Sequence, residues 1–116
     1  NLVEVALADL MPSRGDIGAD TIVTEVADYY KLTVEKLLGR DRTKEVAHPR
    51  QIAMYLLREE AKISFPQIGE VLGGRDHSTV MSAIEKIKNQ YDNGEGRVRK
   101  DIDSLRHQLY GQNASA

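Results

Sequence analysis

The chain has 116 residues, enough for one domain with a modest hydrophobic core, and a net charge of −2. It contains no cysteine, which excludes disulfide scaffolds and cysteine-based zinc sites, and no apolar run of about 18 residues that could cross a membrane. Aromatic residues make up 5% of the chain and no alternating apolar run is bounded by hairpin turns, so we expect an intracellular, all-helical protein.

The N-terminal part predicts a short helix followed by a linker. Residues 2–11 place leucine, valine and alanine side chains on one side of a helix, which Pro12 ends. Residues 12–18 contain proline, serine and two glycines, a composition typical of linkers. We interpret residues 1–18 as the end of a preceding domain and a connecting helix, and residues 19–110 as the main domain.

Two helices and a basic segment are predicted next. Apolar residues at helical spacing indicate a helix over Asp20–Tyr30. Thr33 is the expected N-cap of a very short helix over Val34–Leu38, which Gly39 ends. The segment Arg40–Arg50 is basic, and we expect a solvated loop there. The inward-facing positions of the first helix are Ile22, Val23, Val26, Ala27 and Tyr30.

The helix expected after this loop spans roughly Pro49–Lys62. Pro49 fits the first helical turn, where its missing N–H has no intrahelical partner to lose. Glu59 and Glu60 are expected to be solvated. The core-facing residues of this helix are Ile52, Ala53, Leu56 and Leu57.

The stretch Ser64–Tyr91 begins with a second short helix. Ser64 and Gln67 have the spacing of a capping box, in which each side chain bonds the backbone N–H of the other residue. Pro66 lies in the first turn, where proline is tolerated. The apolar positions of this helix are Phe65, Ile68 and Leu72.

A glycine turn and a longer helix complete the stretch. Gly73 and Gly74 suit the left-handed conformation of a helix end, and Asp76 is a natural N-cap. Two helices joined by a short glycine turn form either a helix-turn-helix or an αα-hairpin that merely packs. The apolar positions of the longer helix are Val80, Ala83, Ile84, Ile87 and Tyr91.

A last helix is expected over about Glu95–Tyr110, and residues 111–116 are expected to be a disordered tail. Its apolar seam consists of Val98, Ile102, Leu105 and Leu109.

Catalysis and metal binding have little support in the sequence. Asp76, His77 and Ser78 are residue types of a catalytic triad, but neighbours in the first turn of a helix point in different directions. His48 and His107, like His77, lack the i, i+3 or i, i+4 spacing of helical metal ligands, and no phosphate-binding loop motif is present. Core packing explains the amphipathic helices better than membrane binding does.

DNA binding fits the pattern better. Residues 39–91 hold nine basic and seven acidic side chains, against three and seven in residues 1–38, which permits a nucleic-acid partner without establishing one. The major groove of DNA admits one helix, and hydrogen-bonding groups at the N-terminus of that helix meet the base edges. A basic loop such as Arg40–Lys44 can reach the neighbouring minor groove.

The segment GGRDHSTV at 73–80 closely resembles the signature of the C-terminal DNA-binding domain of the DnaA family, the bacterial chromosomal replication initiators. The similarity extends through VADYYKLTVEKLLG (26–39), PRQIAMYLLRE (49–59) and SFPQIGEVLGG (64–74), and so covers about residues 18–110. It implies a compact all-α domain, preceded by a connecting helix, with an embedded Trp-repressor-like helix-turn-helix. Such domains recognise DnaA boxes, which are short asymmetric duplex sites at replication origins.

The resemblance also implies roles for individual residues. Ser78 and Ser82 depart from the threonine and histidine common in the family, and His48 from a common arginine. Arg75 has a structural alternative, as a turn residue paired with a carboxylate. The implied base contacts are Arg42 in the minor groove and Pro66, Asp76, His77 and Ser78 in the major groove. The implied contacts to the DNA backbone are Lys44, Arg50, Gln51, Arg58, Arg75 and Thr79.

The resemblance implies no catalytic, metal or cofactor residue in this chain. Residues 1–12 are similar to the end of the helical lid of an ATPase domain, and residues 13–18 to its connector, so ATP and Mg²⁺ would belong to that upstream domain. The implied partners are double-stranded DNA, regulatory proteins and, through the connector, acidic membrane. The isolated domain is expected to be a monomer in the bacterial cytoplasm, at the nucleoid.

Two other functions stay open. A helix-turn-helix transcriptional regulator, most simply a repressor, would need a dimer and a palindromic site. A helical protein-interaction module would use the same polar first turn for a partner protein.

Overall fold

The computed structural model describes residues 17–40 and 43–114, without the side chains of Lys44 and of residues 111–114. Within these ranges every regular element is an α-helix, which confirms the expected all-α class. The connecting helix expected before residue 12 lies outside the described residues. The helices are α2 (Ala19–Tyr29), α3 (Val34–Leu38), α4 (Lys44–Glu59), α5 (Phe65–Val71), α6 (His77–Asp92) and α7 (Gly96–Ala114).

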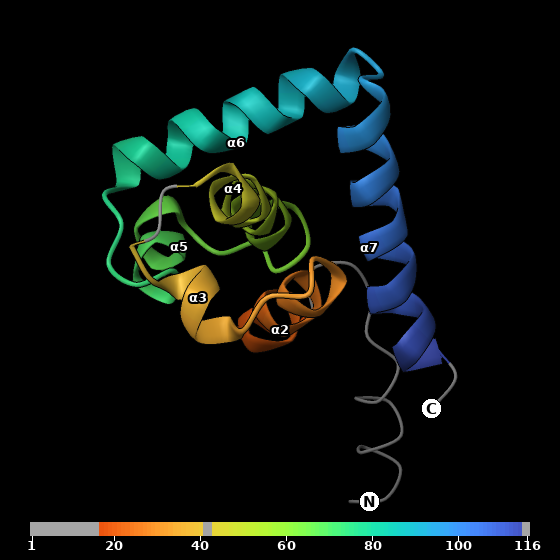
Figure 1. Cartoon of the computed structure of the whole chain (residues 1–116), viewed down its shortest axis with the longest axis horizontal. Helices are drawn as coiled ribbons and strands as arrows, with labels where there is room; N and C mark the ends of the chain where they lie inside the picture. Colours follow the sequence, from red (N-terminus) through yellow and green to blue (C-terminus); the bar gives the residue numbers. More distant parts are fainter. Residues whose placement is uncertain (1–16, 41–42, 115–116) are drawn as a thin grey trace, which may run out of the picture.

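Helix α4 is the centre of the domain. It contacts α2, α3, α5 and α6, which surround it in Figure 1, while α7 runs down one side and packs on α2 and α6. Residues 52–57 of α4 are all buried, so the helix is covered on every side rather than along one stripe. The four predicted core residues of this helix are confirmed, and Met54 and Tyr55 are buried with them.

The start of α4 differs from the prediction. The helix begins at Lys44 with Thr43 as N-cap, so the expected loop is helical from residue 44 onward and Pro49 lies inside the helix, in its second turn. Val46, Arg50 and Ala53 continue the buried face toward the N-terminus at i, i+4 and i+7. The prediction was wrong because an arginine occupies one position of this buried face and hides its periodicity.

The other N-termini follow the predicted caps. The Thr33 hydroxyl accepts a hydrogen bond from the Lys36 N–H at 3.0 Å. Both bonds of the capping box form, from the Gln67 N–H to Ser64 Oγ at 3.3 Å and from the Ser64 N–H to Gln67 Oε1 at 3.0 Å. The predicted helix boundaries of α2 and α5 hold to within a residue or two, and Tyr30 is the half-buried C-cap of α2.

Two buried carboxylates fasten α7 to the rest of the domain. Asp101 is 6% exposed and accepts hydrogen bonds from the hydroxyls of Tyr29 (3.0 Å) and Tyr30 (2.7 Å). Glu60 is fully buried, contrary to the prediction that it is solvated, and accepts from Arg106 Nε at 2.7 Å and from the Tyr110 hydroxyl. Burial lowers the pKa of Arg106, but the bond and the charge of Glu60 outweigh it and raise that pKa overall.

These contacts hold the C-terminal part of α7 against the domain. The helix was predicted to end near Tyr110 with a disordered tail after it, but its backbone remains helical through Ala114. Leu109 is buried at 1% exposure one residue before the Tyr110 anchor, so the last described turns extend from a fixed segment.

Candidate nucleic-acid interface

The turn between α5 and α6 is tight because three glycines allow close backbone contacts. Gly73 and Gly74 have φ angles of +85° and +86°, the left-handed region that glycine adopts without strain. The N–H groups of Gly74 and Arg75 both donate to the Gly69 carbonyl at 2.9 Å, and a Cβ on Gly69 would lie 2.1 Å from the Arg75 carbonyl oxygen. The predicted glycine turn is therefore confirmed, and it folds directly back onto α5.

The same turn packs against the end of α3. A Cβ on Gly73 would lie 2.3 Å from the carbonyl oxygen of Leu38, whereas one on Gly74 would meet nothing within 4 Å. Helix α3, the turn and α6 are thus held together at one point in the fold.

The first turn of α6 presents polar groups to solvent. Asp76 is the N-cap, and its Oδ2 accepts a hydrogen bond from the Ser78 N–H at 3.0 Å. His77, Ser78 and Thr79 are exposed, while Val80 is fully buried and fixes the orientation of the helix. Pro66 is also exposed, in the first turn of α5. Five of the predicted contact residues therefore lie on the surface of the helix-turn-helix.

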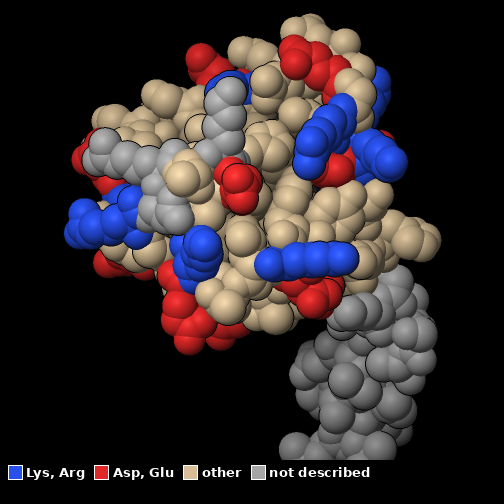
Figure 2. Space-filling view, viewed as in Figure 1, with Lys and Arg blue, Asp and Glu red and all other residues tan. Residues whose placement is uncertain are grey.

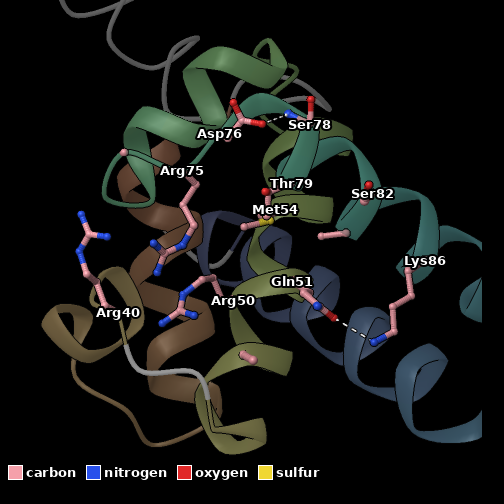
Figure 3. A pocket seen from close by; sticks show the side chains of 13 residues that line it. Arg40, Arg50, Gln51, Met54, Arg75, Asp76, Ser78, Thr79, Ser82 and Lys86 are labelled. Carbon is pink, nitrogen blue, oxygen red and sulfur yellow. Dashed lines mark hydrogen bonds between the residues drawn. The ribbon is translucent and has the colours of Figure 1, made fainter.

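A groove of about 750 Å³ runs beside this first turn. Its walls come from α4, the glycine turn, the side of α6 that faces α4, and Arg40 after the end of α3 (Figure 3). Arginine side chains gather at one end of the groove and Lys86 lies at the other. The lining residues are Arg40, Ala47, Arg50, Gln51, Met54, Gly74, Arg75, Asp76, Ser78, Thr79, Ser82, Ala83 and Lys86.

Two of the arginines converge on one backbone carbonyl. Arg50 is 6% exposed and donates from Nε to the Leu37 carbonyl at 2.8 Å and from Nη2 to the Gly39 carbonyl at 3.0 Å. Arg75 donates from Nη2 to the same Gly39 carbonyl. The residue that follows, Arg40, is exposed and lines the groove. Both guanidinium groups therefore hold the chain segment that leads into the basic loop.

The remaining predicted backbone contacts occupy different places. Gln51 and Thr79 line the groove, and Gln51 Oε1 accepts from Lys86 Nζ at 3.5 Å. Arg58 lies outside the groove, with its guanidinium 4.5 Å from the centre of the Phe65 ring and one N–H donated to the Ile63 carbonyl at 3.1 Å. Arg42 and the side chain of Lys44 lie outside the described residues.

Several groove residues were missed by the sequence analysis. Arg40 and Met54 were not singled out as contacts, and Ser82 was noted only as a departure from the family. Lys86 was not assigned a role. The available signal was the i, i+3, i+7 spacing of Thr79, Ser82 and Lys86, which places them along one line of α6.

The surroundings of His48 disfavour its charged form. Its ring lies edge-on to Tyr30, with centroids 6.2 Å apart, and its Nε2 is buried with no hydrogen-bond partner among the residues described. Burial lowers the pKa of His48 from 6.5, and Arg97 and Lys86 lower it further, against an opposing effect of Asp101.

The charge on the molecule is local rather than general. Lysine and arginine alternate with aspartate and glutamate over the face shown in Figure 2. Among the residues that the structure describes, the groove is lined, in contrast, by four cationic side chains and a single acidic one, Asp76. Among the described residues, no cluster of three or more potential metal ligands occurs, and no helix has the length and apolarity needed to span a membrane.

Comparison with known proteins gives consistent matches. Residues 19–87 match the family described as "Bacterial dnaA protein helix-turn-helix". The chain is 46% identical to the chromosomal replication initiator protein DnaA of Herpetosiphon aurantiacus over 115 residues, covering 97% of this chain and 24% of that protein. It is 47% identical to the protein of the same name from Dechloromonas aromatica over 110 residues, covering 95% and 22%.

A solved structure supports the same fold. The crystal structure of a DNA replication initiation factor matches with a TM-score of 0.68 and 28% identity, over 90% of this chain and 29% of the other. The chain thus spans about a quarter of the length of the curated relatives it matches.

Proposed function

The chain belongs to the family of bacterial DnaA helix-turn-helix domains, and we propose that it binds double-stranded DNA sequence-specifically at DnaA boxes of a replication origin. The observation that carries the proposal is the exposed polar first turn of α6 beside a cationic groove. A helix N-terminus is the part of a helix-turn-helix that meets base edges, and cations beside it meet phosphates.

In the proposed complex, the N-terminus of α6 enters the major groove. His77 donates to or accepts from a purine edge, Asp76 accepts from a cytosine amino group through the lone pairs that its cap bond leaves free, and the Ser78 hydroxyl takes either role. Pro66, at the start of α5, contacts a thymine methyl group. Arg42 is proposed for the adjacent minor groove, where the negative potential of a narrow A/T tract favours arginine.

The backbone contacts are proposed for two groups of residues. Gln51, Thr79 and Arg75 border the groove, and Lys44 is proposed for the same strand. Arg58 is exposed beside α5 and would reach a phosphate on the other side of the helix-turn-helix. Because Arg50 is buried, we propose that it supports DNA binding mainly by holding the backbone of Gly39 in place.

The wider roles of the family remain proposals for this chain. We propose that ATP binding with Mg²⁺ belongs to the part of the longer relatives that this chain does not span, and that regulatory proteins and acidic membrane are further partners, the latter through residues 1–18. We also propose that the domain acts as a monomer at the nucleoid. Sedimentation distinguishes this from a dimeric transcriptional regulator, which would associate as its concentration rises.

The experiment that tests the function compares two duplexes by fluorescence anisotropy, one with a DnaA box and one with the box scrambled. We expect tight binding to the box and weak, strongly salt-dependent binding to the scrambled duplex. The variant His77→Ala should cost about 1–3 kcal/mol on the box and little on the scrambled duplex. His107→Ala, an exposed histidine on α7, is the matched control and should change neither.

The outcomes separate the alternatives. Equal affinity of the unmodified chain for both duplexes would contradict sequence-specific recognition by the first turn of α6. Absence of any salt-dependent binding would favour a protein-interaction module instead.

A further inference from the structure

A second cavity adjoins the groove on the side away from the glycine turn. It has a volume of about 440 Å³ and lies between the N-terminal half of α4, the end of α2, α6 and the start of α7. Ala47, Gln51 and Lys86 line both cavities, so the two form one continuous depression along α4 and α6. The new wall is added by Tyr30, Glu45, His48, Pro49 and Arg97.

Arg97 is the cation that this second cavity adds. It is the second residue of α7, and its side chain is 82% exposed. It forms a 3.9 Å ion pair with Asp101, which also accepts hydrogen bonds from the hydroxyls of Tyr29 and Tyr30. An ion pair this long and this exposed contributes little to stability, so the guanidinium can turn toward a ligand at small cost.

The charges along the depression favour an anionic, extended partner. The described cationic side chains that line it are Arg40, Arg50, Arg75, Lys86 and Arg97, against the acidic Asp76 and Glu45. Counted over the described part of the chain, this is a local excess of three positive charges, whereas the net charge of the whole chain is −2. The continuity with the helix-turn-helix, and the presence of cations at both ends of the groove and in the second cavity, match a phosphate backbone rather than a compact anion.

We propose that the depression carries the DNA backbone beyond the recognition site, so that Arg97 contacts a phosphate in the sequence flanking the box. This inference rests on the proposed function and extends it, because it assigns a DNA contact to α7, outside the helix-turn-helix. Glu45 lines the same depression, and its negative charge would repel a phosphate there. Neutralising Glu45 should therefore strengthen DNA binding, whereas neutralising Arg97 should weaken it.

The test uses two duplexes with the same box, one trimmed to the box and one extended by about one helical turn, roughly 10 base pairs, on each side. Arg97→Gln should weaken binding to the extended duplex by about threefold to tenfold, lower its salt slope by about one, and leave the trimmed duplex unchanged. Glu45→Gln should strengthen binding to the extended duplex only.

Lys100→Gln is the matched control. Lys100 is exposed on the same helix and lines neither cavity, so it removes the same charge elsewhere and should affect neither duplex. Circular dichroism of each variant should match the unmodified chain, because none of the three side chains is buried.

The proposal is overturned if Arg97→Gln changes neither duplex, if it weakens both equally, or if Lys100→Gln has the same effect. Failure of the proposed function is a different result, since the unmodified chain would then bind box and scrambled duplexes alike. If the unmodified chain prefers the box but neither Arg97→Gln nor Glu45→Gln changes binding, the proposed function stands and the proposed contact with flanking DNA is wrong.

Discussion

Arg50 and Arg75 show how a single residue type supports both the fold and the surface. Each reaches the Gly39 carbonyl from a different element, α4 in one case and the glycine turn in the other. A charged donor bound to a buried or half-buried carbonyl stabilises more than a neutral one does. The position of Arg40, and the direction in which the chain leaves α3, therefore depend on side chains that the family resemblance assigns to DNA.

The first prediction concerns Arg50. Arg50→Gln removes the donors to Leu37 and Gly39, so we expect a loss of about 2–3 kcal/mol in the free energy of unfolding, measured by urea denaturation. Arg58→Gln, at an exposed arginine with one backbone bond, should cost less than about 1 kcal/mol. Equal stability of the two variants would refute the structural role of Arg50.

The second prediction concerns the pH dependence caused by His48. Because burial lowers its pKa in the folded state below 6.5, the unfolded chain binds the proton more readily. The contribution of the neutral His48 ring to the free energy of unfolding is complete above about pH 6.5, its ordinary pKa. That contribution is lost as the pH falls through the lower pKa of His48 in the folded chain. The charged groups that act on His48 are Asp101, which favours protonation, and Arg97 and Lys86, which oppose it.

Melting temperatures between about pH 7.5 and pH 5 check this. The unmodified chain should lose more stability toward acid than His48→Gln does. His107→Gln, at an exposed position on α7, should follow the unmodified chain. A pH profile of His48→Gln that is parallel to that of the unmodified chain would remove His48 as a contributor.

At the scale of elements, local signals determined what could be predicted from the sequence. The N-termini of α3, α5 and α6 were predictable because Thr33, Ser64 and Asp76 make cap bonds within three residues. The start of α4 and the burial of Glu60 could not be predicted in this way. The buried Arg50 donates to carbonyls 11 and 13 residues away in the sequence, and the buried Glu60 accepts from Arg106, 46 residues away. Such partners leave no local pattern.

The glycine turn gives the third prediction. Gly73 and Gly74 have nearly the same positive φ, but only Gly73 faces the Leu38 carbonyl. Gly74→Ala should therefore lower the free energy of unfolding only by the cost of placing alanine in the left-handed conformation, about 1–2 kcal/mol. Gly73→Ala adds a backbone clash and should cost clearly more, with loss of box binding, because α3 and the helix-turn-helix must move apart. Denaturation and anisotropy measure both, and equal costs would contradict the contact with α3.

At the scale of the whole molecule, the candidate site combines one contiguous segment with several distant ones. Residues 76–79 could be predicted because they are consecutive and lie in a recognisable motif. The groove could not, because Arg40, Gln51 and Lys86 come from separate elements that only the packing of α3, α4 and α6 brings together. The net charge of −2 conceals this local concentration of cations.

The fourth prediction separates net charge from the location of charge. Lys86 and Lys88 are exposed lysines two residues apart on α6, but only Lys86 lines the groove. Either alanine substitution changes the net charge of the chain by the same amount. If binding depends on the overall field, both should weaken it equally. If phosphate contacts in the groove dominate, Lys86→Ala alone should lower the salt slope by about one, equally on box and scrambled duplexes.

We expect the second result, because salt screens the field of an exposed charge over about one Debye length, near 8 Å at physiological salt, and Lys88 does not line the groove. Titrations of both variants at several salt concentrations decide between the two. A loss of affinity in Lys88→Ala that matches that of Lys86→Ala would mean that the groove is not where the phosphates bind. An effect of Lys86→Ala restricted to the box would instead make Lys86 a base-reading residue.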